Sequence, residues 1–242
     1  AAKKMKSVKV QKFPGAYQIY TQGVEFASKK KYPEAIDKFS KALELNPSLT
    51  AAYIEYARAL VLSGRRREGL DKIAEGLTYA KHGDEHMRLQ RERDSLAEIF
   101  YTNSTFQKYQ NGLNFARLER NGAAVDAFEK ALAIEPDNVA ILVAYAHVLL
   151  LEEGAGASAR AVEQAYKLNP EKDEVKILYA EVVLAKEPER SLVLLKNLVK
   201  EKNAPEQAYI LYARAMARGG NLKEALDFLH DKAEHNPDWL MS

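Results

Sequence analysis

The chain has 242 residues, of which 47% are hydrophobic, so it is long enough to bury a sizeable apolar core in one or two domains. It carries 36 basic and 34 acidic residues, and this near balance does not indicate nucleic acid or an anionic membrane as a partner. There is no cysteine, which excludes disulfides and thiolate metal sites, and no apolar stretch of about 18 residues that could span a bilayer.

The first 15 residues form a basic arm, with five lysines among the first twelve positions. A solvated arm is the favoured interpretation, and a tether to a membrane or another anionic surface is the alternative. The chain begins with Ala1 rather than methionine, which is compatible with the removal of a signal or anchor segment.

After the arm, two stretches of the chain, 16–48 and 105–137, share one pattern. The string Tyr-x-x-Gly-x-x-Phe-Ala occupies 20–27 in the first and 109–116 in the second. Each string is followed, at matching spacings, by two small residues that flank a phenylalanine and then by a proline: Ala35, Phe39, Ala42 and Pro47, and again Ala124, Phe128, Ala131 and Pro136.

Four further units fit between and after these two, starting near Thr50, Val139, Asp173 and Glu206. In place of the glycine of the shared string they carry Ala57, Ala146, Ala180 and Ala213. A small residue there lets the two helices of a unit pack closely, because a larger side chain would force them apart. Phe39, Ile73, Phe128, Val162, Leu195 and Leu229 are predicted to fill the core between units.

This combination resembles the tetratricopeptide repeat family, whose unit is a helix–turn–helix of about 34 residues. The resemblance implies an all-α fold, a right-handed superhelical solenoid of about six units. One additional bridging helix is predicted at 84–104, between the units of 16–83 and those of 105–239. The break after it is expected at 102–105, and a single helix continuing into the third unit is the alternative. A short tail at 240–242 follows, with continuation of the natural chain left open.

No catalytic constellation is present: the sequence has no Gly-rich phosphate loop, no His-Glu-x-x-His and no Gly-x-Ser-x-Gly. His82 and His86 have the spacing of metal ligands on a helix, but Gly83 lies between them and no third ligand is near. The chain is therefore predicted to be a non-enzymatic protein without a metal or cofactor.

The resemblance also implies a concave groove, lined by the fifth, ninth and twelfth residues of each unit. The fifth and ninth residues are Tyr20, Val24, Ile54, Arg58, Tyr109, Leu113, Val143, His147, Ile177, Glu181, Ile210 and Arg214. The twelfth are Ala27, Val61, Ala116, Leu150, Leu184 and Ala217. The set is mostly apolar and aromatic, which favours an amphipathic helix or an extended apolar peptide as ligand. It lacks the lysine and asparagine combination with which co-chaperones of this family grip a C-terminal carboxylate. Packing against neighbouring helices is the alternative role for the branched fifth-position residues.

The sequence thus predicts a scaffold or adaptor that binds a protein or peptide within a larger bacterial assembly. The alternative is a regulatory or substrate-docking module of a larger enzyme. Trp239 begins an apolar end where a repeat array needs a polar cap. It is expected to fold back on the sixth unit, to lead into further chain or to form an oligomer contact. The sequence names neither the partner nor the compartment, cytoplasmic or periplasmic.

Overall fold

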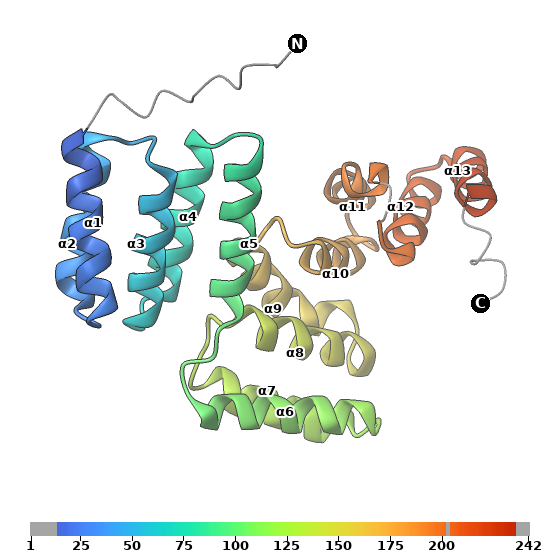
Figure 1. Ribbon diagram of the computed structural model, residues 1–242. Helices are drawn as coiled ribbons and strands as arrows, with labels where there is room; N and C mark the ends of the chain where they lie inside the picture. Colours follow the sequence, from blue (N-terminus) through green and yellow to red (C-terminus); the bar gives the residue numbers. More distant parts are fainter. Residues whose placement is uncertain (1–13, 202–203, 236–242) are drawn as a thin grey trace, which may run out of the picture. The chain divides into compact units, whose positions relative to one another are not determined.

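The computed structural model describes residues 14–201 and 204–235. Residues 1–13 of the predicted basic arm and the apolar end around Trp239 lie outside the described residues, whereas the last two residues of that arm, Pro14 and Gly15, belong to the first helix. The described part contains thirteen α-helices, one 3-10 helix and no strand (Figure 1). The predicted all-α repeat fold is confirmed. The chain divides into two compact units, Ala1–Leu96 and Ala97–Ser242, which are described separately below.

The first unit contains two helix pairs followed by a single helix (Figure 1). The helices of each pair pack along one another, and α2 also packs on α3. The bounds are α1 (Pro14–Ser28), α2 (Tyr32–Leu45), α3 (Thr50–Leu62), α4 (Arg66–Tyr79) and α5 (Asp84–Glu98), of which the last two residues belong to the second unit.

The second unit contains four successive helix pairs, each packed on the next. One of its helices, Pro188–Leu195, is short and is followed by a 3-10 turn whose Leu198 and Val199 are buried with the core. The bounds are α6 (Asn103–Arg117), α7 (Asn121–Leu132), α8 (Val139–Glu152), α9 (Ala155–Leu168), α10 (Asp173–Val183), α11 (Pro188–Leu195), η1 (Leu198–Lys200), α12 (Glu206–Arg218) and α13 (Leu222–His235).

The repeat pattern predicts the core correctly. All six small residues of the close helix contact are buried, as are five of the six predicted core side chains, and Leu229 is half-buried. Pro33 and Pro188 lie in the first turns of α2 and α11, where the missing amide proton breaks no helical hydrogen bond.

In five of the six helix pairs, the turn contains one residue with a positive φ angle. Gly64, Gly154 and Gly220 supply it in three of the pairs, with φ angles of 84°, 87° and 91°. In the pairs α1–α2 and α6–α7 the same conformation falls on Lys30 (φ 58°) and Glu119 (φ 56°). Side chains with a Cβ rarely adopt it, so these two turns carry local strain.

The extra segment differs from the predicted helix at 84–104. α5 ends at Glu98 and α6 begins at Asn103, so a break separates two helices and no continuous helix forms. Thr102 caps α6, its side chain accepting a hydrogen bond from the Thr105 amide. The break is earlier than predicted because buried polar groups hold it. The Glu135 carboxylate accepts the Tyr101 amide at 2.8 Å.

Asn138 completes this junction from the start of α8. Its side-chain oxygen accepts the amides of Ala140 and Ile141, which caps the helix. Its amide group donates to the carbonyl oxygens of Glu98 and Ile99, at 3.4 and 3.2 Å. One fully buried side chain therefore ties the α7–α8 turn to the end of α5.

Candidate functional site

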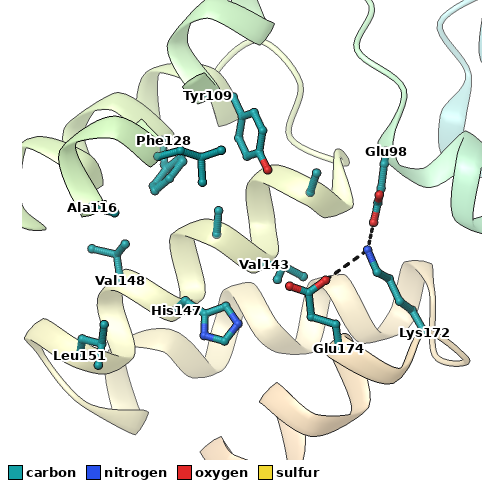
Figure 2. Close-up of a pocket in the computed structure, with 13 residues that line it drawn as sticks. Glu98, Tyr109, Ala116, Phe128, Val143, His147, Val148, Leu151, Lys172 and Glu174 are labelled. Atoms are coloured by element: carbon teal, nitrogen blue, oxygen red, sulfur yellow. Dashed lines mark hydrogen bonds and ion pairs between the residues drawn. The ribbon is translucent and has the colours of Figure 1, made fainter. Parts of the chain in front are cut away.

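A groove of about 370 Å³ opens in the second unit, along the first helices of its repeats (Figure 2). α6 and α8 supply most of its lining, α7 contributes one ring, and the end of α5 and the start of α10 close one end. The lining residues are Glu98, Tyr109, Leu113, Ala116, Phe128, Ala140, Val143, Ala144, His147, Val148, Leu151, Lys172 and Glu174.

One end of the groove is apolar. Ala116, Val148 and Leu151 gather there, away from the charged side chains (Figure 2). Leu151 is 78% exposed, so this apolar side chain is directly accessible from solvent. Large exposed apolar side chains that belong to a concave surface typically mark interaction sites.

The wall formed by α6 depends on a close helix contact at Gly112. A Cβ atom at this position would lie 2.5 Å from the Phe128 ring, so only glycine lets α6 approach α7 this far. The contact leaves the Phe128 ring fully buried beneath Tyr109, with ring centroids 6.1 Å apart. Tyr109 also contacts Phe100 (5.1 Å), and its hydroxyl points towards α8 in Figure 2. These contacts fix the orientation of a half-buried aromatic ring in the groove.

The other end of the groove is charged. The Lys172 ammonium forms an ion pair with Glu98 and lies 3.3 Å from a carboxylate oxygen of Glu174 (Figure 2). Burial lowers the pKa of Lys172, but the hydrogen bonds and charges of Glu98 and Glu174 outweigh it and hold the pKa above its usual range. Burial and the same two carboxylates raise the pKa of the Tyr109 hydroxyl, and Lys172 offsets them only in part.

Four of the twelve groove residues predicted at the fifth and ninth positions line this cavity: Tyr109, Leu113, Val143 and His147. The other four in the second unit lie along α10 and α12. Ile177 is buried in the core and Glu181 accepts a hydrogen bond from Gln207, whereas Ile210 and Arg214 are exposed.

The four groove residues predicted at the same positions in the first unit have varied surroundings. Tyr20 packs on Phe39 with ring centroids 6.0 Å apart, and Val24 is exposed. Ile54 is only 1% exposed and belongs to the core. Arg58 makes a two-pronged ion pair with Glu92 of α5, at 2.6 and 2.7 Å.

A further contact explains why the Arg58 side chain is held in this position. Its third guanidinium nitrogen donates to Glu55 at 2.7 Å, so two carboxylates share one cation. The hydrogen bond that Arg58 donates to Glu92 is the main reason that the pKa of Arg58 is raised. Arg58 thus fastens α5 to α3, and a ligand would have to compete with both carboxylates.

The structure adds features that the repeat positions do not reveal. In the first unit a cavity of about 270 Å³ is bordered by Tyr53, Tyr56 and Tyr79. Its side chains are already paired, since the Tyr53 hydroxyl donates to the Pro47 carbonyl (3.1 Å) and Lys72 lies over the Tyr56 ring. The sequence signal for this cavity is a set of tyrosines that lie outside the fifth and ninth repeat positions.

In the described part of the chain, no helix is long and apolar enough to cross a membrane. Among the same residues, no group of three or more histidine or acidic side chains is arranged to hold a metal ion.

No family model matches the chain. An uncharacterized protein of Methanocaldococcus jannaschii is 38% identical over 67 residues, which make up 28% of this chain and 78% of that protein. Tetratricopeptide repeat protein 36 of Caenorhabditis elegans is 38% identical over 63 residues, or 26% of this chain, and the chain spans only 35% of that relative. The solved structure of YrrB, a tetratricopeptide repeat protein with an unusual peptide-binding site, is 18% identical with a TM-score of 0.48, over 83% of this chain and 93% of that one.

These similarities agree with the features already described. Helix pairs recur along the chain, a glycine or alanine lies at each close contact, and proline closes several of the units. Proteins with such repeats serve in general as scaffolds for protein–protein interaction. The chain has the fold of the tetratricopeptide repeat proteins and is 38% identical to one of them over 63 residues.

Proposed function

We propose that this protein is a non-enzymatic interaction scaffold that binds an apolar peptide or an amphipathic helix in the groove of its second unit. The observation that carries this proposal is the open groove of about 370 Å³, lined along α6 and α8 mainly by apolar side chains. Its size falls in the range of known ligand sites, about 300–1,000 Å³.

The shape of the lining favours a ligand that buries apolar side chains. Leu113, Val148 and Leu151 offer aliphatic surface, while Ala116 and Ala144 leave room beside them. An amphipathic helix uses such a surface through residues spaced three or four apart, and an extended peptide uses alternate residues. Each leucine-sized side chain that becomes buried contributes about 1.5–3 kcal/mol before the entropy of association is subtracted.

A pull-down from native extract tests the proposal with the tagged full chain as bait. Leu151→Glu places a charge at the apolar end of the groove and is expected to remove most of the captured partner. Leu118→Glu is the matched control, because Leu118 is 64% exposed, follows α6 and does not line the groove. Both variants should keep the helix content of the wild type by circular dichroism.

The comparison between the two variants decides the result. Equal capture by wild type and Leu151→Glu would place the partner elsewhere on the chain. Loss of capture by both variants would show an unspecific effect of added negative charge and would equally contradict the groove.

A further inference from the structure

The groove is polarised along its length, and this polarity bears on the kind of peptide that it accepts. Apolar side chains occupy the end near Leu151, and three charged ones, Glu98, Lys172 and Glu174, occupy the other (Figure 2). All three belong to the second compact unit, as do the other residues that line the groove. The polarity is therefore a property of this unit alone.

The charged end has one carboxylate more than its cation can neutralise. Lys172 is engaged mainly by Glu98, and its contact with Glu174 is the longer one, at 3.3 Å. The Lys172 side chain is 22% exposed, whereas that of Glu174 is 52% exposed. An incoming peptide therefore meets the Glu174 carboxylate first.

A peptide carboxylate would find no comparable partner in this groove. Among the described residues that line it, Lys172 is the only lysine or arginine, and its ammonium already contacts two carboxylates. Bringing a further carboxylate there would add repulsion from Glu98 and Glu174. A cationic side chain would instead gain an ion pair at the margin of an apolar site, where such pairs set the orientation and the choice of ligand.

We infer that the groove selects a peptide segment that carries lysine or arginine next to its apolar residues, with the cation at the Glu174 end and the apolar side chains towards Leu151. This inference rests on the proposed function and adds the charge and the direction of the ligand.

Selection from a random peptide library displayed on phage, with peptides of about three helical turns, provides the probe. The full chain is the bait, and enriched peptides are expected to combine apolar residues with lysine or arginine. One enriched peptide and its Lys→Glu analogue are then synthesised, and their affinities are compared by fluorescence polarisation. The wild type should prefer the lysine peptide by roughly fivefold, the range of an exposed ion pair.

Charge variants of the protein identify the side chain that recognises the charge of the peptide. Glu174→Lys should reverse the preference, and Glu174→Gln, which keeps the size of the side chain, should abolish it. Glu171→Lys is the matched control, because Glu171 precedes the same helix and does not line the groove, and it should keep the wild-type preference.

The outcomes separate the inference from the function on which it rests. If Leu151→Glu weakens binding of the selected peptide, but the wild type does not prefer the lysine peptide or Glu174→Lys leaves that preference unchanged, the inference is wrong and the apolar groove stands. If Leu151→Glu leaves the affinity unchanged, the peptides bind elsewhere and both proposals are wrong.

Discussion

Single glycines decide how closely the helices of this protein approach. Gly23 and Gly112 occupy matching places in the two units that share the Tyr-x-x-Gly string, and each faces a phenylalanine ring. A Cβ would lie 2.6 Å from Phe39 at the first site and 2.5 Å from Phe128 at the second. The two tyrosine–phenylalanine contacts also agree, at 6.0 and 6.1 Å between ring centroids. The sequence repeat therefore corresponds to a repeat of packing geometry.

Gly112→Ala is expected to destabilise the protein by about 1–3 kcal/mol, because the new methyl group overlaps the buried Phe128 ring. Gly122→Ala is the matched control. It makes the same change near the start of α7, where a Cβ meets nothing within 4 Å, and it should be neutral or slightly stabilising. Urea unfolding followed by circular dichroism measures both. Equal effects of the two substitutions would refute the steric explanation.

The turns at Lys30 and Glu119 predict a gain of stability. Glu119→Gly should stabilise the protein by about 0.5–1 kcal/mol, since glycine relieves the strain of a positive φ and gives back only part of the gain as unfolded-state entropy. Gly154→Ala, in the equivalent turn of the next pair, should be destabilising for the same reason. Thermal unfolding compares the two variants with the wild type. A loss of stability in Glu119→Gly would show that the Glu119 side chain contributes more than its strain costs.

Between the helices, the junction of α5 and α6 shows how buried polar groups place a chain break. Glu135 and Asn138 are almost fully buried, and between them they bind backbone groups of the residues from Glu98 to Thr102. Buried backbone groups need partners, so this network fixes where α5 ends.

Asn138→Ala should destabilise the protein by about 2–4 kcal/mol, because it removes a helix cap and the hydrogen bonds that the Asn138 amide group donates to the Glu98 and Ile99 carbonyl oxygens. Asn138→Asp separates the two effects. It keeps the capping oxygen but loses the donor and sets a second carboxylate beside Glu135, whose oxygen lies 3.4 Å from the present amide nitrogen.

The pH dependence of the aspartate variant has a definite sign. Repulsion from Glu135 should raise the pKa of the introduced carboxyl above its unfolded value of about 3.9, so the penalty relative to wild type should shrink as pH falls and grow as pH rises. Urea midpoints of both proteins over the acidic range test this. A penalty independent of pH would mean that the lost donor, not the added charge, dominates.

The sequence predicts these helices well and their junction less well, for physical reasons. The period of small and apolar residues determines which faces pack, and Thr102 is a typical N-cap residue. The fold and the start of α6 after Thr102 therefore follow from local patterns. The role of Glu135 does not follow from such patterns. The residue before the closing proline is asparagine in three other units (Asn46, Asn169 and Asn236), and only tertiary contact shows what the glutamate binds.

The same distinction holds for the candidate groove. Tyr109, Leu113, Val143 and His147 occur at repeat positions, which is why the sequence places them on one surface. Glu98, Lys172 and Glu174 belong to the extra helix, a loop and a helix start, and no repeat position brings them together. The charge of the groove, and with it the expected ligand, therefore depends on the folded structure.

In both units, the ionisation of partly buried tyrosines makes the stability of the protein depend on pH in the alkaline range. Burial raises the pKa of Tyr20 and Tyr53 in the first unit and of Tyr109 and Tyr145 in the second, and neighbouring carboxylates add to the rise. In the unfolded chain these hydroxyls ionise near pH 10. The folded state therefore holds protons that the unfolded state has lost, and stability should fall as pH rises above about 10.

Tyr145 offers the sharpest test of this alkaline loss. Burial and a hydrogen bond to the Glu129 carboxylate, 2.9 Å long, raise the pKa of Tyr145 to about 12. Its contribution to stability is complete below about pH 10 and is lost as pH rises towards about 12.

Tyr145→Phe should therefore lower the urea midpoint at neutral pH and make the alkaline decline of that midpoint less steep. Glu129→Gln keeps the hydroxyl but removes the charge, so tyrosinate absorbance should appear at lower pH. An unchanged alkaline slope in Tyr145→Phe would mean that the other raised tyrosines, and not this hydrogen bond, determine how the protein unfolds in alkali.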